Sequence, residues 1–226
     1  MSLSKQVRNW EANLRARYNR DLSTPENRRR AHIYNLFFDH AILRGIWKNM
    51  FEIAPGVFRS NHPTHARFAR MKAAGIRTVI NLRGVSESAH YWTEEETCRA
   101  LGLNLVSTTL YARNAASRDD TLNLIAIFPS AEKPFTMHCK SGADRAGFAS
   151  AIYLMAIEGQ PVSQARKMLS PRFFHLRLGP VAILDYILDV YEAHTKRTPI
   201  SFEDWVKDHY DPVEIEAAFS RKDPVT

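Results

Sequence analysis

Short apolar segments alternate with helical segments through the middle of the chain, and this alternation constrains the fold more than any other feature. The candidate strands are Arg77 to Leu82, Leu103 to Ser107 and Lys133 to His138. The helical segments are Thr64 to Ala74, Thr93 to Leu101, Ser117 to Phe128 and Arg145 to Glu158. Strands that alternate with helices form a sheet with helices on both faces. We therefore predict an α/β fold, in which a central parallel or mixed sheet is flanked by helices.

Capping residues set the expected helix ends. Ser117 with Asp120 forms a capping box for a helix that stops near Pro129. Thr93 with Glu96 forms another, which predicts that the preceding helix starts at Thr93. The remaining helical segments are Val162 to Leu169, Pro180 to His194, Phe202 to His209 and a last helix capped by Asp211. The sequence therefore predicts that the C-terminal part is helical.

The length and composition indicate one globular domain. A chain of 226 residues with 45% hydrophobic and 24% charged residues has enough apolar side chains for one core and is neither disordered nor of low complexity. The longest apolar run, residues 147–157, is shorter than the ~18 to 20 residues that span a bilayer. The N-terminus lacks an apolar signal region. We expect a cytoplasmic protein whose two cysteines, Cys98 and Cys139, remain thiols.

Much of the positive charge lies at the N-terminus. Residues 1–30 contain eight basic and three acidic side chains, within a formal net charge of +7 for the chain. Trp10, Leu14 and Tyr18 recur at helical spacing, which favours a helix docked on the domain. We assign residues 1–30 as a basic helical extension and residues 31–226 as the single domain, with 196–226 as its helical appendage. A solvated basic face is the simplest role for the extension; we expect at most weak contact with an anionic membrane and no nucleic-acid binding.

The residues that bear chemistry are concentrated in HCKSGADRAG, residues 138–147, where the last strand meets the long helix. Backbone N–H groups of such a loop converge on an anion, and the helix dipole adds positive charge. Gly142 gives the backbone freedom that this turn needs. The same field favours a thiolate, so we expect the pKa of Cys139 to lie in the range of about 3.5 to 7.5 that activated thiols show. Arg145 is able to bind two phosphoryl oxygens at once.

This arrangement predicts that Cys139 is a nucleophile and that Arg145 is a phosphate clamp. The predicted phosphate-binding residues are Lys140, Ser141, Gly142, Ala143, Asp144 and Arg145.

The segment Cys139-Lys-Ser-Gly-Ala-Asp-Arg145 resembles the Cys-x5-Arg signature of the cysteine-dependent protein tyrosine and dual-specificity phosphatases. The resemblance extends from about Phe51 to His194, where PGVFRSNHP and GIRTVINLRG look like elements of bacterial dual-specificity-type members. It implies a phosphatase-like fold and a two-step reaction without a metal or other cofactor. Cys139 attacks phosphorus, an acid protonates the leaving oxygen, and water hydrolyses the phosphocysteine. It also implies that His138 braces the loop and tunes the thiolate.

Two positions depart from the family pattern. Ala146 stands where the family has Ser or Thr, and we expect turnover to be slower for lack of that hydroxyl. Residues 111–117, the expected place of the general acid, contain no carboxylate. Asp144 is our first candidate for the acid because it lies beside the clamp arginine, and Asp119 and Asp120 are the alternatives. An unassisted leaving group is the remaining alternative.

Two other cations follow predicted strands. Arg83 has two interpretations of equal weight: it faces the same pocket as the loop, or it forms a structural ion pair. Lys140 either favours multiply phosphorylated substrates or lies in solvent. The histidines at 62, 65, 175, 194 and 209 lack metal-ligand spacing with cysteines or carboxylates, so we assign no metal.

Four functions fit these features. The first is a phosphatase for phosphotyrosine, and also phosphoserine or phosphothreonine, in proteins. The second has the same mechanism and acts on a phosphoinositide or a small phosphate ester. The third is a non-enzymatic phosphate-binding module, which Ala146 and the missing acid favour. A rhodanese-like sulfurtransferase ranks last, because its cysteine loop does not require an arginine clamp.

Overall fold

A computed structural model of the protein describes residues 3–225 and contains one five-stranded mixed sheet. The strands are β1 (Phe51–Ala54), β2 (Val57–Asn61), β3 (Thr78–Asn81), β4 (Asn104–Ser107) and β5 (Phe135–Cys139). Their order is β1-β2-β5-β3-β4, and only the β1–β2 pair is antiparallel. The predicted α/β class is confirmed, and β5 lies at the centre of the sheet. β1 and β2 were not among the three candidate strands, because each is short and contains a charged residue.

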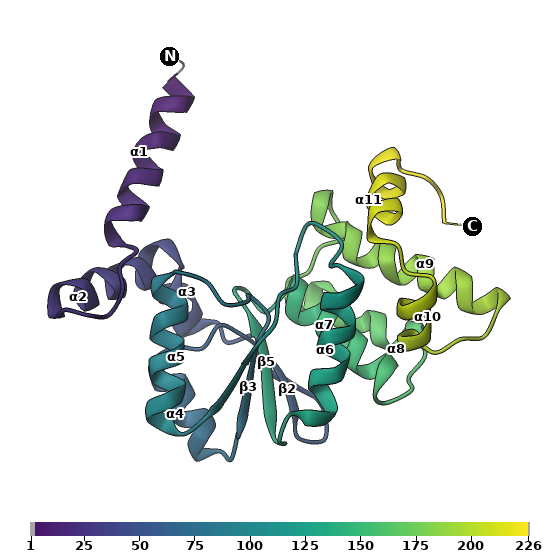
Figure 1. Cartoon of the computed structure of the whole chain (residues 1–226), viewed down its shortest axis with the longest axis horizontal. Helices are drawn as coiled ribbons and strands as arrows, with labels where there is room; N and C mark the ends of the chain where they lie inside the picture. The colour runs from purple at the N-terminus through teal and green to yellow at the C-terminus, as the bar shows by residue number, and fades with distance from the viewer. Residues whose placement is uncertain (1–2, 226) are drawn as a thin grey trace.

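Helices cover both faces of the sheet, as Figure 1 shows. α4 (His65–Ala73) and α5 (Ala89–Leu101) lie on one face and pack on a small core that includes Phe68 and Val79. α6 (Arg118–Ser130) and α7 (Asp144–Ala156) lie on the other face, where the main core is. Because α7 follows β5 directly, the central strand delivers its last residue to the N-terminus of a buried helix.

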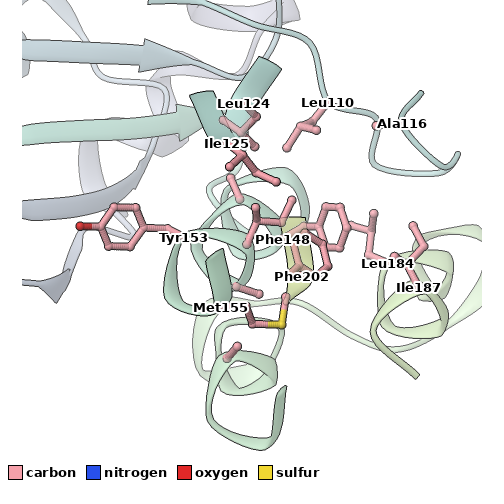
Figure 2. Close-up of a cluster of buried hydrophobic side chains, with 14 of the residues drawn as sticks. Leu110, Ala116, Leu124, Ile125, Phe148, Tyr153, Met155, Leu184, Ile187 and Phe202 are labelled. Atoms are coloured by element: carbon pink, nitrogen blue, oxygen red, sulfur yellow. The ribbon is translucent and has the colours of Figure 1, made fainter. Parts of the chain in front are cut away.

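The C-terminal part is helical, as predicted, and completes the main core. Its elements are α8 (Val162–Ala165), three 3₁₀ turns (Arg166–Met168, Pro171–Phe173 and Gly179–Ala182), α9 (Ile183–Arg197), α10 (Phe202–Asp208) and α11 (Pro212–Arg221). Figure 2 shows Phe148 of α7 beside Phe202 of α10 and Leu184 of α9. The predicted cap of the last helix is confirmed, since Asp211 accepts hydrogen bonds from Val213 N and Glu214 N.

Four helical elements precede the sheet: α1 (Leu3–Tyr18), α2 (Pro25–Ile33), a π-helical turn η1 (Tyr34–Phe38) and α3 (Ala41–Ile46). The helix predicted around Trp10 is confirmed, but the prediction that it docks on the domain is wrong. α1 projects away from the domain (Figure 1), Trp10 is 65% exposed, and Tyr18 at the end of the helix stacks on Phe38. Basic side chains are frequent in α1, with Arg15 and Arg17 in its last turn, so the helix favours solvent over burial.

One predicted capping box is correct and the other is wrong. Ser117 caps α6 by accepting from Asp120 N, but α6 continues through Pro129 to Ser130. α5 starts at Ala89, after the N-cap residue Ser88, and not at Thr93. The Thr93 hydroxyl donates instead to the carbonyl of Ala89, and the Glu96 carboxylate pairs with Arg28. A long-range ion pair has therefore replaced the local capping contact.

No helix among residues 3–225 is long and apolar enough to cross a membrane.

Candidate active site

The central feature of the site is the loop between β5 and α7, residues 140–143. β5 is buried along its whole length, and Cys139 is its last residue, with 1% of its surface exposed. The Cys139 Sγ accepts a hydrogen bond from Gly142 N at 3.2 Å. Gly142 has a φ of +74°, and a Cβ atom there would lie 2.6 Å from Asn61 N. Only glycine therefore allows the loop to fold this closely against β2.

Every carbonyl of the loop is hydrogen-bonded to a group outside it. Lys140 O accepts from His62 N at 3.2 Å, and Ser141 O accepts from Asn49 Nδ2 at 3.2 Å. The carbonyls of the next two residues, Gly142 and Ala143, accept from the guanidinium of Arg59. Since a carbonyl and the N–H of its peptide group point in opposite directions, these bonds turn the loop's N–H groups away from those partners. Gly142 N then donates to Cys139 Sγ, and Ala143 N to the Ser141 hydroxyl.

The Arg59 guanidinium is a buried support that the sequence analysis did not identify. It lies on β2 and is wholly buried, and its Nη2 donates to Gly142 O at 2.6 Å and Ala143 O at 3.1 Å. Its Nη1 donates to Met168 O at 2.7 Å, and its Cζ lies 4.0 Å from the centre of the Phe173 ring. The sequence signal that could have identified Arg59 is the single arginine in the segment PGVFRSNHP. It lies among residues that are buried in β2.

Arg59 also adds positive charge beneath Cys139. Burial lowers the pKa of Arg59 to about 10, while the nearby Cys139 and Asp144 oppose that shift. The guanidinium is therefore still charged at neutral pH, and it favours an anion at the loop.

Arg145 lies in the first turn of α7 and is half-buried. Among the residues that the structure describes, no hydrogen bond or ion pair occupies its guanidinium. Arg59 and Arg145 thus differ: both Nη atoms of the first donate to backbone carbonyls, and the second is available to an anion.

Asp144 begins α7 and is held by a histidine from the C-terminal part. Its Oδ1 lies 2.8 Å from His175 Nδ1, and its side chain is 23% exposed. The other two candidate acids lie in the first turn of α6. Asp120 Oδ2 accepts from the Ser117 hydroxyl at 2.7 Å, as a capping residue does, and Asp119 is exposed. No hydrogen bond or ion pair within residues 3–225 joins either of them to the loop.

His138 precedes Cys139 and is buried with Glu94 and His62. His138 Nε2 lies 2.5 Å from Glu94 Oε1, and the three side chains place possible ligand atoms within 4.8 Å of one another. However, Arg83 Nη1 lies 3.1 Å from His62 Nδ1, and a guanidinium only donates. Burial also lowers the pKa of His62 well below its ordinary value. The neutral ring therefore carries its proton on Nε2, and the cluster fits a hydrogen-bonded support better than a metal site.

Arg83 and Lys140 both bind a carboxylate from the N-terminal segment. Arg83 forms a bidentate pair with Asp39, at 2.7 and 3.0 Å, and Arg44 lies 2.8 Å from the same carboxylate. Lys140 Nζ lies 3.7 Å from Asp39 Oδ1. Burial would raise the pKa of Asp39, but Arg83 and then Arg44 hold it well below its ordinary value. Of the two alternatives for Arg83, the structure contains the ion pair.

Ala146 is fully buried and carries no hydroxyl to replace the one expected there. Ser150, one turn later in α7, donates its hydroxyl to Ala146 O at 2.6 Å.

Comparisons with known proteins place the chain in a family. The family PTP-SAK, described as "Swiss Army Knife protein, DSP-PTPase phosphatase domain", matches residues 52–176. The dual specificity protein phosphatase TpbA of Pseudomonas aeruginosa is 25% identical over 115 residues, which are 49% of this chain and 48% of TpbA. The chain thus spans about half the length of this curated relative.

A solved structure with a TM-score above 0.5 shares the fold. A DUF442 protein from Shewanella putrefaciens CN-32 has a TM-score of 0.53 at 19% identity, covering 65% of this chain and 90% of that chain. The crystal structure of TpbA has a TM-score of 0.49 at 18% identity, covering 76% of this chain and 91% of that chain. The matched family segment includes β2, the loop and its arginine, and it exceeds half of the chain. The chain therefore belongs to the DSP-PTPase phosphatase domain family, as the resemblance of Cys139 to Arg145 predicted.

Proposed function

We propose that this chain hydrolyses phosphomonoesters of proteins, as a protein tyrosine or dual-specificity phosphatase, through a phosphocysteine intermediate. The observation that carries the proposal is the loop itself, whose carbonyls are all held outward around Cys139 while the Arg145 guanidinium stays unoccupied. Such a loop binds a phosphoryl group and stabilises its transition-state charge. A reducing compartment such as the cytoplasm keeps the sulfur reduced, as this chemistry requires.

The proposed reaction has two steps. The Cys139 thiolate attacks phosphorus, the bond to the leaving oxygen breaks, and Asp144 gives that oxygen a proton. Water then attacks the phosphocysteine, the S–P bond breaks with its electron pair returning to sulfur, and Asp144 takes a proton from the water. Arg145 binds two phosphoryl oxygens in both steps. Ala146 removes one hydroxyl that would assist the second step, so we propose that breakdown of the intermediate limits turnover.

The surroundings of the loop favour an aryl phosphate over a polyanionic one. Asn49 ties Ser141 O of the loop to Phe173 O, and the next residue, Phe174, is 62% exposed. Its ring packs edge-on against Trp47, with 4.3 Å between ring centres. Aromatic edges of this kind suit the ring of phosphotyrosine. In contrast, Asp39 already pairs with Arg83 and Lys140, so the extra phosphates of a phosphoinositide would have to compete with this carboxylate for both cations.

The test is a comparison of kcat/KM over phosphotyrosine peptides, phosphoserine peptides and phosphoinositides. We expect phosphotyrosine peptides to be hydrolysed with the highest efficiency. Preference for phosphoinositides would support the alternative substrate with the same mechanism. Tight binding of phosphopeptides without release of phosphate would instead support a binding module, for which Ala146 is the motivating observation.

Gly142→Ala is expected to lower the rate of phosphate release on the order of 10²-fold without unfolding the protein. The new Cβ would meet Asn61 N at 2.6 Å and the Ser60 carbonyl carbon at 2.8 Å, so the loop must move. A displacement near 1 Å from productive geometry costs roughly this factor. The measurement is kcat/KM on an aryl phosphate, together with circular dichroism to follow the fold.

Gly159→Ala is the matched control. Gly159 also has a positive φ, +63°, but nothing lies within 4 Å of its Cβ position. The control therefore carries a similar backbone strain without the clash, and we expect its activity to equal that of the wild type. A fully active Gly142→Ala variant would contradict the role of this close contact.

We also propose that residues 1–30 extend from a single domain of residues 31–226 and contact anionic membranes weakly. Arg17 on α1 is exposed, and each such cation near an anionic surface is worth about 1 kcal/mol, or fivefold in binding. We expect Arg17→Glu to weaken sedimentation with phosphatidylserine vesicles at least fivefold at low salt. Arg99→Glu on α5 makes the same change of charge at another exposed site. An equal loss of vesicle binding in that variant would show that α1 is not the membrane-binding segment.

A further inference from the structure

A buried histidine connects the loop to the C-terminal helices. His175 lies between two 3₁₀ turns, and only 1% of its surface is exposed. Its Nδ1 lies 2.8 Å from Asp144 Oδ1, and its Nε2 lies 2.9 Å from Asp185 Oδ2 on α9. Asp185 is itself 3% exposed. Asp185, His175 and Asp144 thus form a hydrogen-bonded chain from the interior to the loop, and Asp144 is its accessible end.

The charged groups around this hydrogen-bonded chain come from three elements. Asp144 on α7 and Asp185 on α9 face His175 directly, and Arg59 on β2 interacts with Asp144 and with Cys139 from below. Burial alone would lower the pKa of His175. The hydrogen bonds and charges of the two carboxylates outweigh burial and raise it to about 9. Both ring nitrogens therefore carry protons at neutral pH, and each proton is shared with a carboxylate.

This arrangement answers a difficulty in the proposed reaction. An ordinary aspartic acid has a pKa near 3.9, so at neutral pH its carboxylate has no proton to give to a leaving oxygen. Asp144 shares a proton that belongs to His175, and this proton does not depart until the pH is well above neutral. The pair is therefore able to donate where a lone aspartate is not.

We infer that His175 is a positioning residue that supplies, through Asp144, the proton taken by the leaving oxygen. The inference rests on the proposed phosphatase function. In the first step the His175 Nδ1 proton passes to Asp144 and then to the leaving oxygen as the P–O bond breaks. The ring becomes neutral and keeps its Nε2 proton toward Asp185. In the second step a proton of the attacking water returns through Asp144 to Nδ1 as the S–P bond breaks.

The test compares two esters in His175→Asn and in the wild type. The asparagine amide keeps a donor toward Asp144 but does not titrate. Expulsion of an alkyl alkoxide needs a proton, whereas p-nitrophenolate leaves without one. At pH 7 we expect kcat/KM to fall about 10²-fold for the alkyl phosphate, the lower range for general acid catalysis. The value for p-nitrophenyl phosphate is expected to change by less than about threefold.

The pH profile separates proton supply from a structural role. For the alkyl ester, the wild-type kcat/KM is expected to fall as the pH rises through about 9, because His175 then loses its proton. His175→Asn should lack this fall, and Asp185→Asn should move it to lower pH, because one of the two carboxylates that raise the pKa is gone. His209→Asn, at an exposed histidine that directly follows α10 and that the proposed reaction does not use, serves as the control.

Several outcomes would overturn the inference. If His175→Asn loses kcat/KM by the same factor on both esters, His175 only maintains the loop. If the variant keeps the wild-type kcat/KM on both esters, His175 has no role. If His175→Asn does not fold, nitrogen chemical shifts of the wild-type imidazole decide the matter: a ring with a single proton at pH 7.5 excludes a stored proton. If the wild type hydrolyses neither ester, the proposed function itself has failed.

Discussion

Cys139→Ser is expected to lower the hydrolysis of aryl and peptide phosphates to background, a loss on the order of 10⁴-fold or more. A serine hydroxyl is not ionised at neutral pH, so no adequate nucleophile remains at the end of β5. The loop itself should persist, because its outward carbonyls are held by His62, Asn49 and Arg59, and none of these contacts involves the sulfur. The variant should therefore still bind a phosphotyrosine peptide, as calorimetry would measure.

Cys98→Ser is the matched control for the loss of a thiol. Cys98 lies in α5, and burial, followed by the charge of Glu94, raises its pKa to about 12. We expect this variant to keep wild-type activity. The same contrast applies to alkylation: iodoacetamide should label residue 139 of the wild type, block activity, and leave residue 98 unmodified. Full activity of Cys139→Ser would reject the phosphocysteine mechanism.

The features that could be predicted from the sequence depend on neighbouring residues. The strand-loop-helix around residues 138–147 followed from an apolar segment, a glycine and a long helical segment within about twenty positions. The caps formed by Ser117 and Asp211 followed in the same way, since each bonds to residues two or three positions away. Local signals of this type persist in the fold where no distant contact competes with them.

The features that could not be predicted depend on residues far apart in the chain. Arg59 bonds to carbonyls more than eighty positions away, and His175 reaches Asp144 across thirty-one. For Arg83 the residue pattern supported facing the pocket and forming an ion pair with equal weight, and only packing placed Asp39 beside it. The start of α5 shows the same effect, because Glu96 pairs with Arg28 across sixty-eight positions and not with its local cap. The residue types by themselves do not specify which residues far apart in the chain come into contact.

These distant contacts assign separate tasks to the site's cations. Arg59 fixes the loop, Arg83 and Lys140 bind Asp39, and only Arg145 of these four has no partner within residues 3–225. A substrate phosphate therefore competes with no carboxylate for Arg145. This division makes the next prediction specific to one residue.

Arg145→Lys is expected to lower kcat/KM for an aryl phosphate by about 10² to 10³-fold, or about 2.7 to 4 kcal/mol of transition-state stabilisation. Lysine keeps the positive charge but loses the planar pair of donors that follows two phosphoryl oxygens as the geometry at phosphorus changes. Inhibition by inorganic phosphate should weaken much less than kcat falls, because a point charge still attracts a resting dianion. The measurement is the pair of constants, kcat and the inhibition constant of phosphate, on one preparation.

Arg166→Lys is the matched control, since Arg166 pairs with Asp189 and Glu192 in the C-terminal part and takes no role in the reaction. It should keep wild-type kinetics. An Arg145→Lys variant with unchanged kcat would show that charge alone suffices at this position. If the variant loses kcat and phosphate affinity by the same factor, Arg145 stabilises the ground state and the transition state equally. The loop amides would then have to provide the catalytic stabilisation.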